Sequence, residues 1–411
     1  MSLREDANQI IRASLLAAQP DTAVREALRD ITFDPQGRLI AVALGKAAWQ
    51  MAKAASLALQ DKLSAGIVIT KYGHLNGALP RITMREAGHP VPDENSFSAT
   101  REAIGLVSGL DKKDSVLLLI SGGGSALFEK PLIEEEELQD ITQQLLSSGA
   151  DIVEINTIRK RLSRVKGGRF AALCAPARVY AIVLSDIIGD PLDMIASGPA
   201  YPDSSTSADA LKIRDKYKLR LSKAAENCLL QETPKALDNV QSLVTGSVRV
   251  LCQAAAQAAQ ALGYKPCVLT ASLCCQAREA GSFLASIAQY HQDSRESLAF
   301  IAGGETVVRL TGKGKGGRNQ EIALAAAAGI SGCRETAVFS LGSDGTDGPT
   351  DAAGGYASHD TAERLKQQGI DIHRVLEDND AYHALQLVDG LIMTGATGTN
   401  VNDVSVLLIR R

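Results

Sequence analysis

Glycine-rich loops follow several short apolar runs in this sequence. In "LLISGGGSAL" (118–127) an apolar run leads directly into three glycines and a serine, which are Gly122, Gly123, Gly124 and Ser125. Glycines leave the backbone amides uncovered, and the free amides at the start of a helix attract an anion. The stretch is equally compatible with a tight strand-to-helix turn that binds nothing. The glycine loop alone leaves both interpretations open.

Positively charged residues accompany glycines at three points where we expect a helix to begin. They are Lys46 after Gly45, Arg318 after Gly316 and Gly317, and Lys166 and Arg169 on either side of Gly167 and Gly168. A cation at a helix N-terminus is unfavourable by about 0.3–1 kcal/mol, because the dipole is positive there. A single case is compatible with a side chain that bends into water. Three cases favour a bound anion such as a phosphate or a carboxylate.

Carboxylates gather in two further loops, "LSDIIGDPLDMIASGP" and "LGSDGTDGPTDAAGG". They are Asp186, Asp190 and Asp193 in the first loop, and Asp344, Asp347 and Asp351 in the second. Mg²⁺ takes one or two carboxylates together with substrate phosphates and water. Aspartate is also a common turn former. We expect at least one of these carboxylates to bind a cation.

Amides, cations and carboxylates at strand ends are what phosphoryl transfer uses, since its catalysis is mostly positioning and charge neutralisation. The sequence lacks the P-loop pattern GxxxxGK[ST] and the hydrolase pattern GxSxG. The stretch "GKGKGG" (312–317) precedes an expected helix, but no acidic residue ends a following strand as dinucleotide binding requires. His89, in "GHPVPDENS", fits a structural role and a substrate contact equally well.

The overall composition excludes several classes of protein. Lys and Arg number 43 and Asp and Glu 47 among the 411 residues, which gives a net charge of −4 and no sign of a nucleic-acid partner. Seven cysteines occur without CxxC spacing, which favours reduced thiols. The first residues predict an amphipathic helix, and no run reaches the roughly 18 apolar residues of a membrane span. We expect a cytoplasmic protein without membrane contacts.

Short apolar runs alternate with helical patterns, which predicts an α/β fold with a largely parallel sheet in the first half. We expect two domains, 1–235 and 236–411. The runs at 298–304 and 305–312 predict a hairpin and therefore a mixed second sheet. Expected strands lie at 38–45, 65–70, 115–120, 178–186, 242–246, 298–304 and 305–312.

Eight ordered motifs, spread from about residue 40 to 405, resemble the class II glycerate 2-kinases, whose C-terminal part is the MOFRL domain. They are "ALGKAAWQMA", "GHPVPDENS", "SGGGSAL", "INTIRKRLSRVKGGRFA", "LSDIIGDPLDMIASGP", "GGETVVRLTGKGKGGRNQEIALA", "SDGTDGPTDAAGG" and "TGATGTNVNDV". The resemblance implies a Rossmann-like, three-layer N-terminal domain, a three-layer C-terminal domain with a mixed sheet, and an active site in the cleft between them. Arg161 departs from the pattern, where a histidine is more usual.

The resemblance also implies an activity, namely ATP- and Mg²⁺-dependent phosphorylation of D-glycerate at its 2-hydroxyl. The implied catalytic residues are Lys46 and Arg318, with Asp190 or Asp193 orienting the hydroxyl or accepting its proton. Asp186, Asp344 and Asp347 are the expected metal ligands. The expected ATP contacts are Gly122, Gly123, Gly124, Ser125, Lys166, Gly316, Gly317 and Asn319.

Two other functions stay open. One is a hydroxypyruvate or tartronate reductase, for which the sequence offers no complete dinucleotide-binding fingerprint, since the acidic residue after "GKGKGG" is missing. The other is a protein that binds a nucleotide or sugar acid without turnover. The choice of the 2-hydroxyl depends on the resemblance alone, and both a monomer and a homodimer are compatible with the sequence.

Overall fold

The computed structural model describes residues 2–185, 189 and 192–411. These residues form two compact units, each described by itself. The described part of the glycine-loop unit comprises residues 23–185 and 192–245, and that of the C-terminal unit comprises 2–22, 189 and 246–411. The expected domain boundary after residue 235 stays a prediction.

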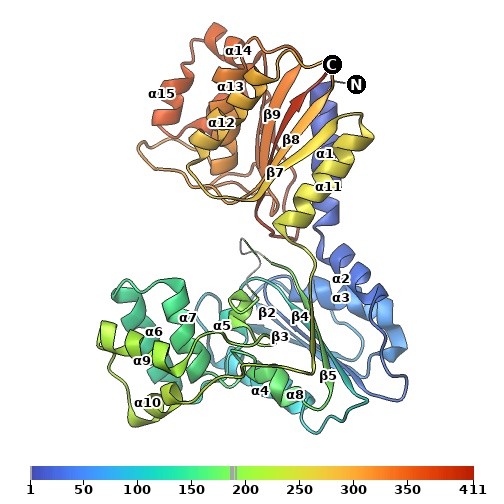
Figure 1. Cartoon of the computed structure of the whole chain (residues 1–411), viewed down its shortest axis with the longest axis vertical. Helices are drawn as coiled ribbons and strands as arrows, with labels where there is room; N and C mark the ends of the chain where they lie inside the picture. Colours follow the sequence, from blue (N-terminus) through green and yellow to red (C-terminus); the bar gives the residue numbers. More distant parts are fainter. Residues whose placement is uncertain (1, 186–188, 190–191) are drawn as a thin grey trace. The chain divides into compact units, whose positions relative to one another are not determined.

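A six-stranded parallel sheet in the order β3-β2-β1-β4-β5-β6 forms the centre of the glycine-loop unit (Figure 1). Every residue of β1 and β4 is buried, because helices cover both faces of a parallel sheet. This arrangement confirms the predicted fold class. The strands are β1 (Leu39–Leu44), β2 (Ala65–Lys71), β3 (Ile82–Ala87), β4 (Ser115–Ile120), β5 (Arg178–Val183) and β6 (Val240–Val244).

Helices pack on both sides of this sheet. α3 (Ala48–Leu59) contacts β1 and β2, whereas α4 (Glu94–Leu106) contacts β2 and β3 from the other face (Figure 1). The chain leaves β1 toward one edge and continues from β4 toward the other, so the β1–β4 boundary is the topological switch point, where open α/β sheets bind ligands. The remaining helices are α2 (Pro20–Arg29), α5 (Gly124–Leu127), α6 (Glu135–Ser147), α7 (Ile152–Leu162), α8 (Arg169–Cys174), α9 (Ser207–Tyr217) and α10 (Lys223–Leu230).

Helices α6, α7, α9 and α10 pack on one another around a second apolar core (Figure 1). Leu138, Ile141 and Leu145 of α6 meet Ile158 and Leu162 of α7 there, all of them buried. This small helical layer holds α7 in place, and α7 carries several of the polar residues discussed below.

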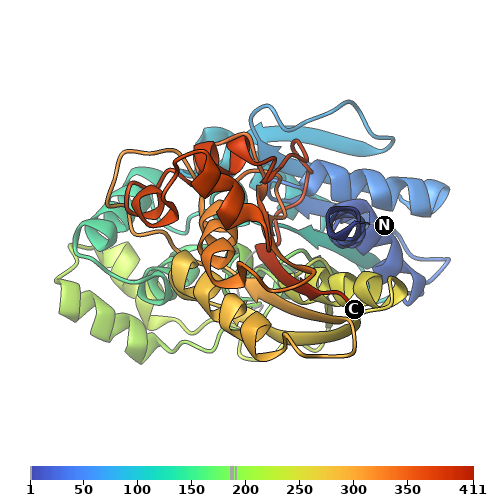
Figure 2. The same cartoon turned by 90° about the horizontal axis from the view of Figure 1, so that it is seen from above.

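The C-terminal unit contains a mixed sheet in the order β11-β10-β9-β12-β8-β7. Helices α12 and α13 cover one face and α1 and α11 the other (Figures 1 and 2). Its strands are β7 (Lys265–Leu273), β8 (Leu298–Gly304), β9 (Thr336–Gly342), β10 (Gly354–Ser358), β11 (Leu391–Ile392) and β12 (Asp403–Ile409). Its helices are α1 (Leu3–Ala17), α11 (Val248–Ala261), α12 (Ala277–Tyr290), α13 (Arg318–Ile330), α14 (Thr361–Gln367), α15 (Ile372–Glu377) and α16 (Ala381–Leu387).

The sheet is mixed, as predicted, but the expected hairpin between 298–304 and 305–312 is wrong. Residues 305–312 form no strand, and Val307 makes only an isolated bridge to Gln276. The antiparallel partner of β8 is β12, whose residues are all buried between β8 and β9. The C-terminal apolar run outcompetes the nearer segment because it is buried on both faces.

The N-terminal helix α1 belongs to the C-terminal unit, where it packs against α11 (Figure 1). The buried Asp6 carboxylate accepts a 2.6 Å hydrogen bond from the Tyr264 hydroxyl. The predicted amphipathic helix is confirmed, since α1 buries its apolar residues Leu3, Ala7, Ile10 and Ile11. Among the described residues, no helix combines the length and apolar character needed to cross a bilayer.

Candidate active site

The loops after β1 and β4 lie side by side at the switch point. The amide of Lys46 donates to the carbonyl of Gly122 at 2.9 Å. The Ser121 hydroxyl accepts from the amide of Ala47 at 3.0 Å. These bonds attach the predicted Lys46 directly to the predicted glycine loop.

Gly123 brings the two loops together with a third one. Its φ of +86° lies in the left-handed region, which glycine adopts at little cost. A β-carbon on Gly123 would lie 3.0 Å from Nε2 of His89 and 3.2 Å from Cγ of Lys46. His89 follows β3, so three loops converge on this glycine. The sequence left the role of His89 open, and the structure places it beside Lys46.

The charge of Lys46 has no counter-ion among the described residues, where no carboxylate lies within ion-pair distance of its ammonium. The surroundings are positive as well. Burial lowers the pKa of His89, and the charges of Lys46, Lys71 and His74 lower it further. A half-buried cation with cationic neighbours and free loop amides attracts an anion.

Lys166 has a different environment. Its side chain is fully buried, and its ammonium lies 2.9 Å from the Glu129 carboxylate and donates to the carbonyl of Phe128 at 2.8 Å. Burial lowers the pKa of Lys166 to about 8, although Glu129 raises it. Because Glu129 supplies the counter-charge, the electrostatic argument for a bound anion does not apply at Lys166.

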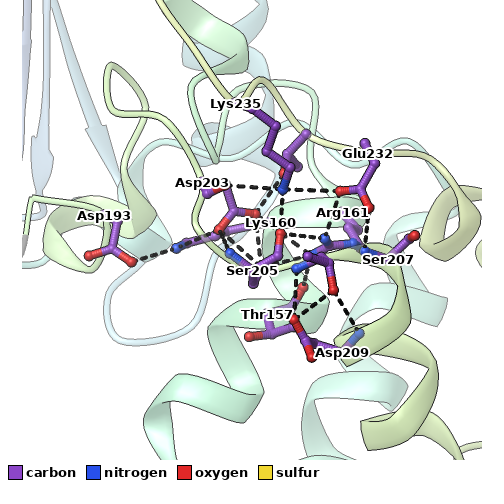
Figure 3. A network of polar contacts seen from close by, with 12 residues as sticks. Thr157, Lys160, Arg161, Asp193, Asp203, Ser205, Ser207, Asp209, Glu232 and Lys235 are labelled. Atoms are coloured by element: carbon purple, nitrogen blue, oxygen red, sulfur yellow. Dashed lines mark hydrogen bonds and ion pairs between the residues drawn. The ribbon is translucent and has the colours of Figure 1, made fainter.

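Asp193 lies at the edge of a buried polar network (Figure 3). The Lys160 ammonium lies between two carboxylates, 3.3 Å from Asp193 and 3.2 Å from Asp203. Asp203 also accepts from Thr233 and Ser205. Its side chain is fully buried, whereas that of Asp193 is 25% exposed. Of the two carboxylates that flank Lys160, Asp193 is thus the one that a ligand can reach.

Two other predicted aspartates, Asp186 and Asp190, lie outside the described residues. Arg161, which departs from the family pattern, is fully buried in the network. It donates to Ser205 at 2.9 Å and pairs with Asp203 at 3.6 Å. Its role is therefore to hold the interior of the unit together.

In the C-terminal unit, Arg318 is the first residue of α13. Its Nε lies 2.5 Å and its Nη2 3.0 Å from the two oxygens of Asp403, and its Nη1 lies 3.1 Å from Glu305. The hydrogen bond with Asp403 raises the pKa of Arg318. Neither Asp403 nor Glu305 was predicted from the sequence. Their signal was weak, since each is a single carboxylate at one end of a strand.

Asp347 caps the same helix. Its two carboxylate oxygens accept from the backbone amides of Asn319 at 3.1 Å and Gln320 at 2.9 Å. Burial raises the pKa of Asp347 to about 6. A β-carbon on Gly317 would lie 2.2 Å from the Asp347 carboxyl carbon, so a glycine is required there.

A metal ion has few ligands in the described part of the chain, where no group of three or more His, Cys, Asp or Glu side chains is arranged to hold one. Both oxygens of Asp347 accept amides, and Asp403 pairs with Arg318. Asp344 uses one carboxylate oxygen to accept from the amide of Thr346. Since Mg²⁺ needs only one or two carboxylates beside phosphates, Asp344 is the best described candidate.

A cavity of about 590 Å³ opens beside Arg318, large enough for a nucleoside. Gly316 and Gly317 form part of its wall with uncovered backbone. Apolar side chains line another part, including Val307, Val308, Leu310 and Pro349. The C-terminal unit therefore combines a cation, helix-opening glycines and an apolar wall.

Residues 6–230 match the family described as "Domain of unknown function (DUF4147)", and residues 298–403 match the MOFRL family. A D-glycerate 2-kinase of Thermotoga maritima is 50% identical over 414 residues, with 99% of each chain covered. A crystal structure of glycerate kinase from Thermotoga maritima superimposes with a TM-score of 0.94, at 50% identity and 99% coverage of both chains. A putative hydroxypyruvate reductase of Agrobacterium vitis is 38% identical, over all of this chain and 95% of that one.

Proposed function

Because the chain belongs to the family of glycerate 2-kinases that join a DUF4147 region to a MOFRL region, we propose that it transfers the terminal phosphoryl group of ATP to D-glycerate. The products are 2-phosphoglycerate and ADP. The observation that carries the proposal is the charge of Lys46, which lies beside the glycine loop at the switch point and has no counter-ion among the described residues.

In the glycine-loop unit, Lys46 contacts oxygens of the transferring phosphoryl group. The amides of Gly122, Gly123 and Gly124 bind the same kind of charge. Phosphoryl transfer spreads negative charge over these oxygens, and fixed positive groups stabilise it without reorganising. Asp193 is held by Lys160 and orients the hydroxyl of glycerate.

In the C-terminal unit, Arg318 contacts the phosphates of ATP while Asp403 and Glu305 fix its guanidinium. The cavity along Gly316 and Gly317 takes the nucleoside part of ATP. Mg²⁺, when bound with ATP, neutralises phosphate charge, and Asp344 is the described residue that would hold it.

An assay of ADP release tests this function. The wild type is expected to release ADP from ATP only when D-glycerate is present. Lys46→Met is expected to reduce that rate by about 10³-fold. Lys53→Met is the control, because Lys53 lies in α3, the helix that follows Lys46, with its ammonium over the ring of Trp49. This variant is expected to leave the rate unchanged.

A second assay of the same purified protein distinguishes a kinase from a reductase. The name of the Agrobacterium vitis relative makes hydroxypyruvate reduction the second candidate. We expect no loss of NADH absorbance with hydroxypyruvate. Consumption of NADH without glycerate-dependent ADP release would replace the kinase by the reductase, and ATP binding with neither reaction would indicate a binding protein.

A further inference from the structure

Helix α7 brings two polar side chains to the glycine loop. Asn156 and Arg159 are three residues apart and therefore share one face of the helix. Nη2 of Arg159 donates to the carbonyl of Ser125 at 3.2 Å. Oδ1 of Asn156 accepts from the Ser197 hydroxyl at 3.1 Å. The hydroxyls of Ser125 and Ser197 lie 3.0 Å apart, so helix, glycine loop and Ser197 form one cluster.

Arg159 differs from its charged neighbours in the same segment. Lys160 lies between Asp193 and Asp203, Arg161 pairs with Asp203, and Lys166 pairs with Glu129. In the described part of the chain, no carboxylate lies within ion-pair distance of Arg159. The Nε of Arg159 is buried and has no hydrogen-bond partner among the residues that the structure describes.

One of the two positive charges of Lys166 and Arg159 therefore lacks a carboxylate partner among the described residues. Glu129 faces Lys166, so the pair of Lys166 and Arg159 has one carboxylate for two cations. The charge of Arg159 also lowers the pKa of Lys166, because two positive charges repel. A partly buried guanidinium without a counter-ion is unfavourable, and an anionic ligand removes that penalty.

The segment that carries Ser197 is strained. Ala196 and Ser197 have φ values of +51° and +59°, in a region that residues with side chains seldom adopt. Such strain persists only where the surroundings enforce it, and it gathers at functional sites. Here the methyl of Ala196 packs against Gly124, where a β-carbon would approach it to 2.6 Å. The strained turn thus holds the Ser197 hydroxyl against the glycine loop.

We infer that Arg159 binds the carboxylate of the hydroxy-acid substrate. A guanidinium matches a carboxylate because two parallel N–H groups meet two oxygens. This inference rests on the proposed function and adds to it the residue that recognises an acid rather than a neutral polyol. A phosphate of ATP has similar chemistry, so the test must separate the two anions.

The test combines one substitution with one change of ligand. D-glycerate is compared with glyceramide, its neutral amide, in the wild type and in Arg159→Gln. In the wild type, the amide is expected to lower kcat/KM by about 10²–10³-fold. Arg159→Gln is expected to lose about as much on D-glycerate and nothing further on glyceramide, because each change removes the same contact.

Four controls make the result specific. The KM for ATP should stay within about threefold in Arg159→Gln. Arg164→Gln, at an exposed position just beyond the helix, should behave as the wild type. Arg159→Lys should recover part of the activity on D-glycerate. Arg159→Gln should be no less stable to urea than the wild type, since it removes an unpaired charge.

Other outcomes would overturn the inference. A normal kcat/KM for D-glycerate in Arg159→Gln excludes Arg159 as the carboxylate site. A raised KM for ATP with an unchanged KM for D-glycerate assigns Arg159 to the nucleotide. If the wild type releases no ADP, the proposed function fails. Calorimetric titration with D-glycerate still tests the inference about Arg159, because the wild type should bind D-glycerate and Arg159→Gln should not. Binding that is equal in both proteins, or absent from both, refutes the inference.

Discussion

Arg318 and Asp403 form a two-point ion pair, with Nε–Oδ2 and Nη2–Oδ1 distances of 2.5 and 3.0 Å. Asp403 is the first residue of β12, so the pair fixes the start of α13 to a central strand. Burial raises the pKa of Asp403 and Arg318 lowers it. The arginine is therefore held rigid from the protein side, while 34% of its side chain stays exposed.

Separate changes to this pair should affect activity and stability differently. Arg318→Ala is expected to lower kcat by about 10³-fold or more and to destabilise the protein, since Asp403 stays buried without its partner. Arg318→Ala combined with Asp403→Ala should regain stability but no activity. Steady-state kinetics and urea unfolding measure both. A near-normal kcat in Arg318→Ala would remove this residue from the mechanism.

Gly123→Ala should disturb the convergence of the three loops. The new methyl would lie 3.0 Å from His89 and 3.2 Å from Lys46, so both side chains must move. Gly149→Ala is a matched control, since Gly149 has a similar φ of +73° and open space around its α-carbon. Both variants should lose about 1 kcal/mol of stability. Only Gly123→Ala should lose most of its turnover, and equal activity of the two variants would contradict this.

Substitutions of Asp193 and Asp203, which belong to one network, should have different effects: the first should lower activity and the second stability. Asp193→Asn is expected to reduce kcat and leave the unfolding midpoint nearly unchanged, because Lys160 keeps Asp203 as its partner. Asp203→Asn should destabilise the protein by about 3–5 kcal/mol, since it weakens the pairing of Lys160 and Arg161. If Asp193→Asn has full kcat, Asp193 does not orient the hydroxyl.

Asp347 should make stability depend on pH. Burial raises its pKa from 3.8 to about 6 in the folded protein. Because the folded-state pKa exceeds the unfolded one, this carboxyl stabilises the fold at pH 4 and below and loses that contribution as the pH rises through 6.

Compared with Asp347→Asn, the wild type should therefore gain up to roughly 3 kcal/mol of unfolding free energy between pH 7 and pH 4, at 1.36 kcal/mol per pKa unit. Urea unfolding of both proteins across this range provides the measurement, and the comparison cancels the other carboxylates. A difference between the two proteins that is constant with pH would show that Asp347 titrates normally.

The sequence predicted the elements that depend on local patterns. Strands β1 and β4 are continuous apolar runs because both faces are covered, and the glycine loop follows directly from β4. The hairpin at 305–312 was wrong because the partner of β8 is a C-terminal strand about a hundred residues away, and register over that distance leaves no local trace.

The residues of the candidate site likewise divide into those with a local signal in the sequence and those without one. Lys46 and Arg318 were visible as cations beside glycines. The partners that decide their electrostatics were not visible, since Arg318 and Asp403 are 85 positions apart. Lys166 looked like Lys46 in sequence, and only burial against Glu129 distinguishes them. Arg159 was hidden because an unpaired charge cannot be recognised until every neighbouring carboxylate has been assigned.

The phosphorus-31 NMR spectrum of the product formed from ATP, Mg²⁺ and D-glycerate tests the proposed function most directly. It identifies the reaction and the hydroxyl that reacts in one measurement, and spiking with authentic 2- and 3-phosphoglycerate assigns the signal. We predict 2-phosphoglycerate together with ADP in equal amounts. A signal of 3-phosphoglycerate, or unchanged ATP after prolonged incubation, would contradict the proposed function.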